Sequence, residues 1–186
     1  MTKIKPTTAK PQGMIASKWF SSPESNHLNG FLLYYNTFRT DGATTNFTAL
    51  TLNEWHDLVI TVKNGYAKVY NNDSLIAQGS GHSSENTTRT LQIGGWSASN
   101  SSYDFDGEIE KVVILDTALT DAQVTQYTNQ DTLPDDNIVA YYRMDEGSGT
   151  TLTDHSGNGY DGTIQNSGSD FHSSETFFHP GNGDIQ

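Results

Sequence analysis

The densest group of oxygen ligands in the sequence is the segment Asp154–Gly159, which reads Asp-His-Ser-Gly-Asn-Gly. Calcium takes about 6–8 oxygen ligands from carboxylates, amides and backbone carbonyls, and turns of this composition supply them. The same residues also have a simpler interpretation, in which Asp154 caps a turn and the glycines permit positive φ angles. From the residues alone, both interpretations stay open.

A second candidate for chemistry is the pair Glu108 and Glu110. In a strand, positions i and i+2 share one face, and glycoside hydrolysis uses two carboxylates on either side of the bond that is cut. The apolar residues Ile109, Val112 and Ile114 set the packing pattern of this strand, which makes the two acids ordinary residues of its exposed face. The six histidines show no metal-binding spacing, and nucleophile-elbow, P-loop and dinucleotide motifs are missing. We therefore predict that the chain is not an enzyme.

Three aromatic residues could bind a ligand, namely Trp19, Trp96 and Tyr103. They are set among segments rich in serine and asparagine, and aromatic rings beside short polar side chains are typical of sugar-binding surfaces. The alternative for each ring is that it covers the rim of the core.

Composition limits the function classes. The net charge is −12, which argues against electrostatic binding to nucleic acid or to anionic lipid. The absence of cysteine excludes disulfides, zinc–thiolate sites and cysteine nucleophiles. No apolar run approaches the ~20 residues of a membrane helix. The first residues lack the apolar stretch of a signal peptide, so we expect either that this export route is not used or that the chain is a piece of a longer protein.

The pattern of hydrophobic residues is that of strands, which predicts an all-β fold, an antiparallel sandwich or barrel. Asn64-Gly65 is a two-residue hairpin signal between two such strands. Thr120 and Gln123 have the spacing of a capping box and predict one short helix near residues 120–128. Strands are expected at residues 14–19, 30–35, 55–62, 66–70, 74–77, 90–93, 107–115, 138–144 and 162–165.

Several sequence segments together resemble the laminin-G-like and pentraxin-like domains of the concanavalin A-like jelly-roll superfamily. They stand in the family's order over roughly residues 10–128: Leu52–Ile60 with its Trp-His pair, Val69–Asn72, Leu91–Gly95, Phe105–Ile114 and Ala118–Val124. The resemblance implies a jelly-roll β-sandwich. It also implies a structural calcium ion, with Asp154, Asn158 and Asp106 as candidate ligands and Asp104 and Asp161 as second choices. Relatives that cut β-glucans carry a Glu-x-Asp-x-x-Glu run, which the segment after Glu108 lacks.

The two halves of the domain occur in the reverse of the order found in the resembling family. Residues Ala140–Thr163 are similar to the family's opening, yet they follow its closing phrases. One explanation is a single domain, residues 1–186, in permuted order, with 1–133 as the second half and 134–186 as the opening half. Another is a fragment cut across a domain boundary, so that 134–186 starts a following repeat. The third is exchange of the opening half between neighbouring copies. We favour the single permuted domain.

The resemblance and the composition together predict a non-catalytic binding module for carbohydrate or a surface protein. It would act outside the cell or at its surface, within a larger secreted or surface protein, supported by Ca²⁺. The alternative is a structural assembly or decoration protein whose copies interlock through exchanged strands, and a glycoside hydrolase is the third hypothesis.

Overall fold

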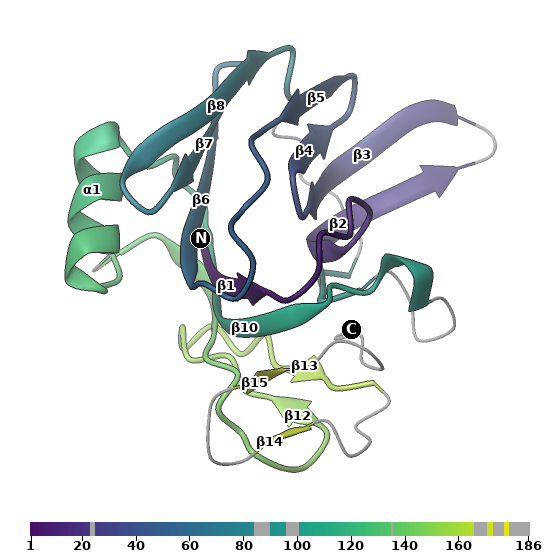
Figure 1. The fold of residues 1–186 in the computed structure, drawn as a ribbon, viewed down its shortest axis with the longest axis vertical. Coiled ribbons are helices and arrows are strands. Elements are labelled where there is room, and N and C mark those ends of the chain that lie inside the picture. Colours follow the sequence, from purple (N-terminus) through teal and green to yellow (C-terminus); the bar gives the residue numbers. More distant parts are fainter. Residues whose placement is uncertain are drawn as a thin grey trace.

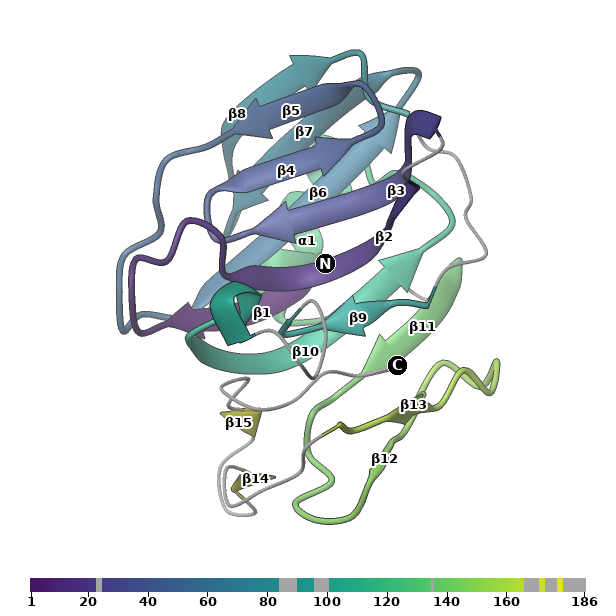
Figure 2. The same ribbon diagram turned by 90° about the vertical axis from the view of Figure 1, so that its right-hand side faces the viewer.

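The structure is a computed structural model, and it describes residues 1–22, 25–83, 90–95, 101–134, 136–165, 171–172 and 177–178. Two antiparallel sheets lie face to face as a β-sandwich (Figures 1 and 2), which confirms the predicted fold class. In the described part of the chain, no helix is long and apolar enough to span a bilayer.

The six-stranded sheet has the order β11-β10-β1-β6-β7-β8. Its strands are β1 (Thr2–Pro6), β6 (His56–Lys63), β7 (Tyr66–Asn71), β8 (Ser74–Ser80), β10 (Gly107–Leu115) and β11 (Ile138–Tyr142). The predicted hairpin between β6 and β7 is confirmed. Asn64 and Gly65 have φ angles of 51° and 76°, the two positive values that a tight type I′ turn requires.

The five-stranded sheet has the order β5-β4-β3-β2-β9. Its strands are β2 (Met14–Ser22), β3 (Ser25–Tyr34), β4 (Thr37–Thr40), β5 (Ala43–Asn46) and β9 (Gln92–Ile93). The predicted strands did not include β1, β4 and β5, nor the short strands β12, β14 and β15 described next. The remaining strands form two short antiparallel pairs. Strand β12 (Thr151–Leu152) pairs with β13 (Gly162–Thr163), and β14 (Phe171–His172) pairs with β15 (Phe177–Phe178).

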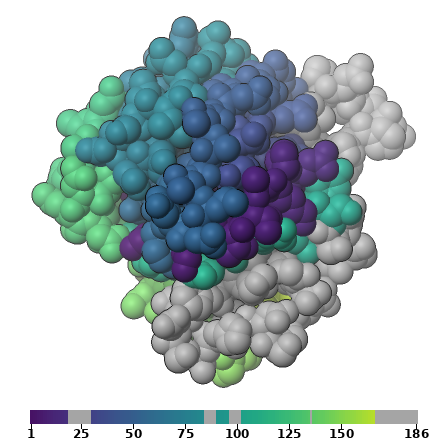
Figure 3. Space-filling view, in the orientation of Figure 1, coloured from purple at the N-terminus to yellow at the C-terminus, as the bar shows by residue number. Residues whose placement is uncertain are grey.

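The helix α1 (Asp121–Gln130) begins as predicted. Thr120 is its N-cap, and Thr120 and Gln123 form the capping box. Leu119 and Val124 are buried with Val59 and Tyr70, so the helix packs on the face of the six-stranded sheet that points away from the sandwich core. Figure 3 shows the helix at the side of the molecule, next to the strands of that sheet.

The main core lies between the sheets and includes the segment that resembles the family's opening. Its residues come from both ends of the chain, for example Ile4, Ile15 and Phe105 together with Tyr142 and Leu152. Strand β11 pairs with β10 along Val112–Leu115. The structure thus places the opening-like segment against the closing strand, while the division of the chain into two permuted halves stays a prediction.

On the opposite side, His82 holds the edges of the two sheets together. This histidine follows β8 of the six-stranded sheet and is buried. Its Nδ1 lies 3.0 Å from the Thr40 hydroxyl and its Nε2 lies 2.8 Å from the Thr45 hydroxyl, both in the five-stranded sheet. The ring also stacks on Phe38, with centroids 5.3 Å apart.

Acid should weaken this link between the sheets. Burial lowers the pKa of His82 below its usual 6.5, so in mild acid the unfolded chain binds the proton more readily than the folded chain. The contribution of His82 to stability is therefore complete above about pH 6.5 and declines as the pH falls through the folded-state pKa. We expect His82→Ala to lose about 2 kcal/mol near neutral pH, because two buried hydrogen bonds disappear.

Urea unfolding of both proteins at several pH values between about 7 and 5 measures this effect. The difference in stability between the native chain and His82→Ala should narrow as the pH falls. A difference that stays constant over this range would contradict the assignment.

Candidate functional site

The outward face of the five-stranded sheet carries polar and aromatic side chains in rows. Cross-strand pairing aligns Tyr34 with Thr37 and Thr37 with Asn46, and the Thr37 hydroxyl donates to the Asn46 side-chain oxygen at 3.0 Å. Arg39 lies two residues from Thr37 and therefore on the same face. The alternate positions, such as Phe38, point into the core. This face therefore carries hydrogen-bonding side chains, and Tyr34, Thr37 and Arg39 on it are all partly buried.

The predicted ligand residue Tyr103 ends a short 3₁₀ helix, η1 (Ser101–Tyr103), and lies near Tyr34. Asp104 forms an isolated bridge with Met14, and Met14 pairs with Tyr34 on the next strand. Tyr34 is close enough to Arg39 and to Tyr103 for each of them to influence it electrostatically. Burial is the main cause that raises the pKa of Tyr34, Arg39 lowers that pKa, and Tyr103 raises it.

We call Tyr34, Arg39 and Tyr103 the tyrosine–arginine cluster. Two partly buried phenol rings offer flat apolar surfaces with a polar end, and the guanidinium offers several hydrogen-bond donors. Such a set can stack against a ring and bind hydroxyl groups. It provides no pair of carboxylates for acid–base catalysis.

The other two predicted aromatic ligand residues are less well placed by the structure. Trp19 is in β2, opposite Gly30 of β3, and its side chain is outside the described part. Trp96 lies outside the described residues altogether. Sequence reasoning missed Tyr34 and Arg39, since they are separated in the chain from Tyr103 and only the strand register brings them together.

The loop that was predicted to bind calcium is organised by Asp154. One carboxylate oxygen of this buried residue accepts the backbone N–H groups of Tyr141 and Ser156 at 3.0 and 2.9 Å. The other accepts the Tyr160 N–H at 3.0 Å and the Ser156 hydroxyl at 2.8 Å. Although burial opposes ionisation, these hydrogen bonds prevail and lower the pKa of Asp154 to about 2.

The structure gives the other two predicted calcium ligands separate local roles. The Asn158 side-chain amide donates to the backbone oxygens of Ile138 and Val139 at 2.9 and 3.0 Å. Asp106 accepts the Thr8 hydroxyl at 2.8 Å, and its other oxygen lies 3.5 Å from the Lys10 ammonium. Hydrogen bonds within the chain thus account for the shape of the loop.

Calcium at this loop stays a prediction of the family resemblance. If the ion binds the native state, excess Ca²⁺ should raise the unfolding midpoint of EDTA-treated protein by mass action. Because four donors already occupy Asp154, the backbone amides of Ser156 and Tyr160 should remain protected from hydrogen exchange in EDTA. An unfolding midpoint that Ca²⁺ leaves unchanged would contradict the prediction of a calcium site in this loop.

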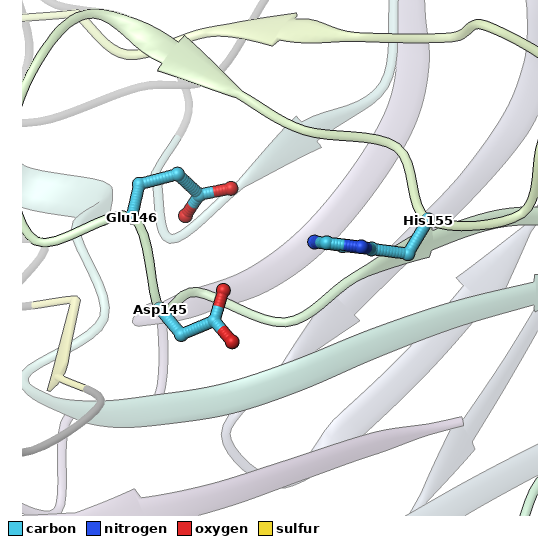
Figure 4. Close-up of side chains that lie close together, drawn as sticks. All are labelled: Asp145, Glu146 and His155. Carbon is cyan, nitrogen blue, oxygen red and sulfur yellow. The ribbon is translucent and has the colours of Figure 1, made fainter.

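One further group was not anticipated from the sequence, namely Asp145, Glu146 and His155 (Figure 4). One potential ligand atom from each lies within 4.8 Å of the others. Within the chain, Asp145 pairs with Arg143 Nε at 3.1 Å, and Glu146 Oε1 accepts the Thr153 N–H at 2.8 Å. Sequence spacing gives no signal for this group, because Glu146 comes before strand β12 and His155 comes after it.

The two strand-face acids of β10 are paired with lysines of β1. Glu108 lies 3.3 Å from the Lys5 ammonium, and Glu110 lies 3.0 Å from that of Lys3. These contacts agree with the interpretation of both residues as part of the face of the sheet that points away from the core.

Comparison with known proteins supports the fold. The sequence profile of the concanavalin A-like lectin/glucanases superfamily matches residues 4–125. Among solved structures, the chain is similar to a presumed carbohydrate-binding protein from Bacteroides ovatus, with a TM-score of 0.61 and 16% sequence identity. The match covers 84% of this chain but 48% of that one, so the chain spans about half the length of its structural relative. No curated protein matches the sequence. The profile covers well over half of the chain, which therefore belongs to the concanavalin A-like lectin/glucanase superfamily.

Proposed function

We propose that this chain is a non-catalytic carbohydrate-binding module, one unit of a larger secreted or surface protein that works outside the cell. The observation that carries the proposal is the tyrosine–arginine cluster on the outward face of the five-stranded sheet. The superfamily and the structural relative support a carbohydrate as the class of ligand.

Recognition would follow from the chemistry of the cluster. The apolar face of a sugar ring would stack on Tyr34 or Tyr103, while Arg39 would donate to ring hydroxyls. Thr37 and Asn46 extend the same row with further hydrogen-bonding groups. A shallow face of this kind binds single sugars weakly, and several copies in one assembly would raise the overall affinity.

The paired strand acids support binding rather than hydrolysis. A glycosidase of the usual kind needs one carboxyl group that donates a proton and a second that acts as nucleophile or base. The pair that the sequence pattern singled out, Glu108 and Glu110, is engaged by Lys5 and Lys3. Hydrolysis that Glu108→Gln abolishes would argue for an enzyme and against this proposal.

A glycan array probed with the full chain would identify the ligand, and two variants would then locate the site. We expect Tyr103→Ala to weaken binding about tenfold, or ~1.4 kcal/mol, because a stacking surface is lost. Tyr66→Ala is the matched control, since Tyr66 is 55% exposed but belongs to β7 of the other sheet. Equal affinities of Tyr103→Ala and the native chain would contradict the proposed face.

A further inference from the structure

Asp145, Glu146 and His155 form a cluster whose donor atoms fit a transition-metal ion. Figure 4 shows the two carboxylates and the imidazole ring pointing toward one another, and one potential ligand atom from each lies within 4.8 Å of the others. Carboxylate oxygen and imidazole nitrogen are both ligands of Zn²⁺, whereas Ca²⁺ takes oxygen ligands. The cluster therefore suits a different ion from the calcium that the family resemblance predicts for the loop Asp154–Gly159.

A second, independent observation is a buried oxygen of Glu146. Its Oε1 accepts the Thr153 N–H at 2.8 Å, but its Oε2 is buried and accepts no hydrogen bond from the described residues. A buried carboxylate oxygen without a donor is costly, and a bound cation is one of the ways in which such an oxygen is satisfied. The hydrogen bond from Thr153 holds the carboxylate in the direction that Figure 4 shows, toward Asp145 and His155.

The backbone that carries the cluster is anchored at both ends. The His155 N–H donates to the Tyr141 carbonyl at 2.7 Å, and the rings of the two residues pack with their centroids 5.9 Å apart. On the other side, the buried Met144 belongs to the main core and directly precedes Asp145. Ligands on an anchored backbone lose little conformational freedom when an ion binds.

An ion can reach the cluster from the surface, because Asp145 and His155 are exposed. Asp145 also lies 3.1 Å from Arg143 Nε, but this ion pair is exposed, and such pairs contribute little to stability. The ligand atoms of a tetrahedral zinc site lie roughly 3.5 Å apart, so modest rotations of the two exposed side chains complete the geometry. A water molecule takes the fourth position of such a site.

We propose that Asp145, Glu146 and His155 form a binding site for a divalent transition-metal ion of the zinc class. Glu146 comes before β12 and His155 comes after it, so one ion closes the loop that contains this strand. An ion that binds the native chain and closes a loop stabilises the fold. The site is thus a metal clip at the end of the sandwich that the opening-like segment forms.

Thermal unfolding of the full chain, freed of metal with EDTA and then of EDTA by dialysis, tests this with Zn²⁺ as the probe. Zn²⁺ at about a hundredfold excess over its Kd should raise the midpoint by about 5 °C. In calorimetric titration, Glu146→Gln and His155→Gln should each bind Zn²⁺ more weakly by at least the ~10-fold that loss of an outer-shell partner costs, because each removes a direct ligand. Glu54→Gln is the matched control, since it makes the same change at an exposed acid before β6 and should keep the native affinity.

Two results would overturn the proposal. One is a midpoint of the native chain that Zn²⁺ leaves unchanged. The other is equal Zn²⁺ affinities of the native chain, Glu146→Gln and His155→Gln, which would put the ion elsewhere.

NMR of the native chain gives a readout that depends on no variant. The ring signals of His155 should change as Zn²⁺ is added, and binding that leaves them unchanged would also overturn the site. Any effect of Ca²⁺ on the midpoint should survive His155→Gln, which separates this site from the predicted calcium loop. No glycan is present in these measurements, so their result is independent of the proposed function.

Discussion

Gly107→Ala is expected to lower the free energy of unfolding by about 3 kcal/mol, because the backbone leaves no room for a side chain there. A Cβ atom at this position would lie 2.4 Å from the Lys5 carbonyl oxygen and 2.7 Å from the Phe105 ring. The carbonyl belongs to β1, which pairs with β10, and Phe105 is buried in the core. Neither neighbour can move without opening the sandwich.

Thermal unfolding measures this effect, and a loss of this size should lower the midpoint by about 10 °C in a chain of this length. Gly42→Ala is the comparison variant, since its φ is +78° but nothing lies within 4 Å of its Cβ. That substitution should lose only the ~1–2 kcal/mol of left-handed strain. Similar midpoints for the two variants would show that close packing at Gly107 is not the cause.

Asp154→Asn should be about as damaging, with a loss of about 3 kcal/mol. The amide keeps the shape of the carboxylate but replaces one accepting oxygen with an NH₂ donor. That donor would face either the N–H groups of Tyr141 and Ser156 or the Tyr160 N–H and the Ser156 hydroxyl. Buried donors without an acceptor are expensive, and hydrogen bonds to a charged group are among the stronger ones.

The pH dependence gives an independent check on the same residue. Because the pKa of Asp154 is about 2 in the folded chain, against an ordinary 3.8, its contribution is complete above about pH 4. The contribution declines as the pH falls through the folded value near 2. In urea unfolding, Asp154→Asn should be far less stable than the native chain at neutral pH, and this difference should narrow as the pH falls below about 4. Asp136→Asn, at an exposed acid, should match the native chain. Equal effects of the two substitutions would contradict the role of Asp154.

The elements with strong local signals were predictable from sequence. The capping box predicted the start of α1, and the pair Asn64-Gly65 predicted the hairpin between β6 and β7. The strands β4 and β5 were missed because their residues are mostly polar, and their identity depends on pairing with β3. Asp41-Gly42 between them was an available hairpin signal that was not used.

The candidate site was predictable only in part. Tyr103 was found as an aromatic residue in a polar segment, whereas its partners Tyr34 and Arg39 come from strands about 65 residues earlier in the chain. Asp154 was singled out as a calcium ligand, which stays a prediction. Its hydrogen bonds, however, go to backbone groups that only the folded loop brings within reach.

Mapping of the bound glycan by NMR tests the central claim most directly. Amide shifts of the native chain would be followed as the best ligand from the array is added. We predict shifts concentrated in β3, β4, β5 and the segment around Tyr103, with little change in residues 138–165 or in β7. Shifts concentrated instead in the loop Asp154–Gly159, or around Asp145 and Glu146, would contradict it and move the site to the other end of the molecule.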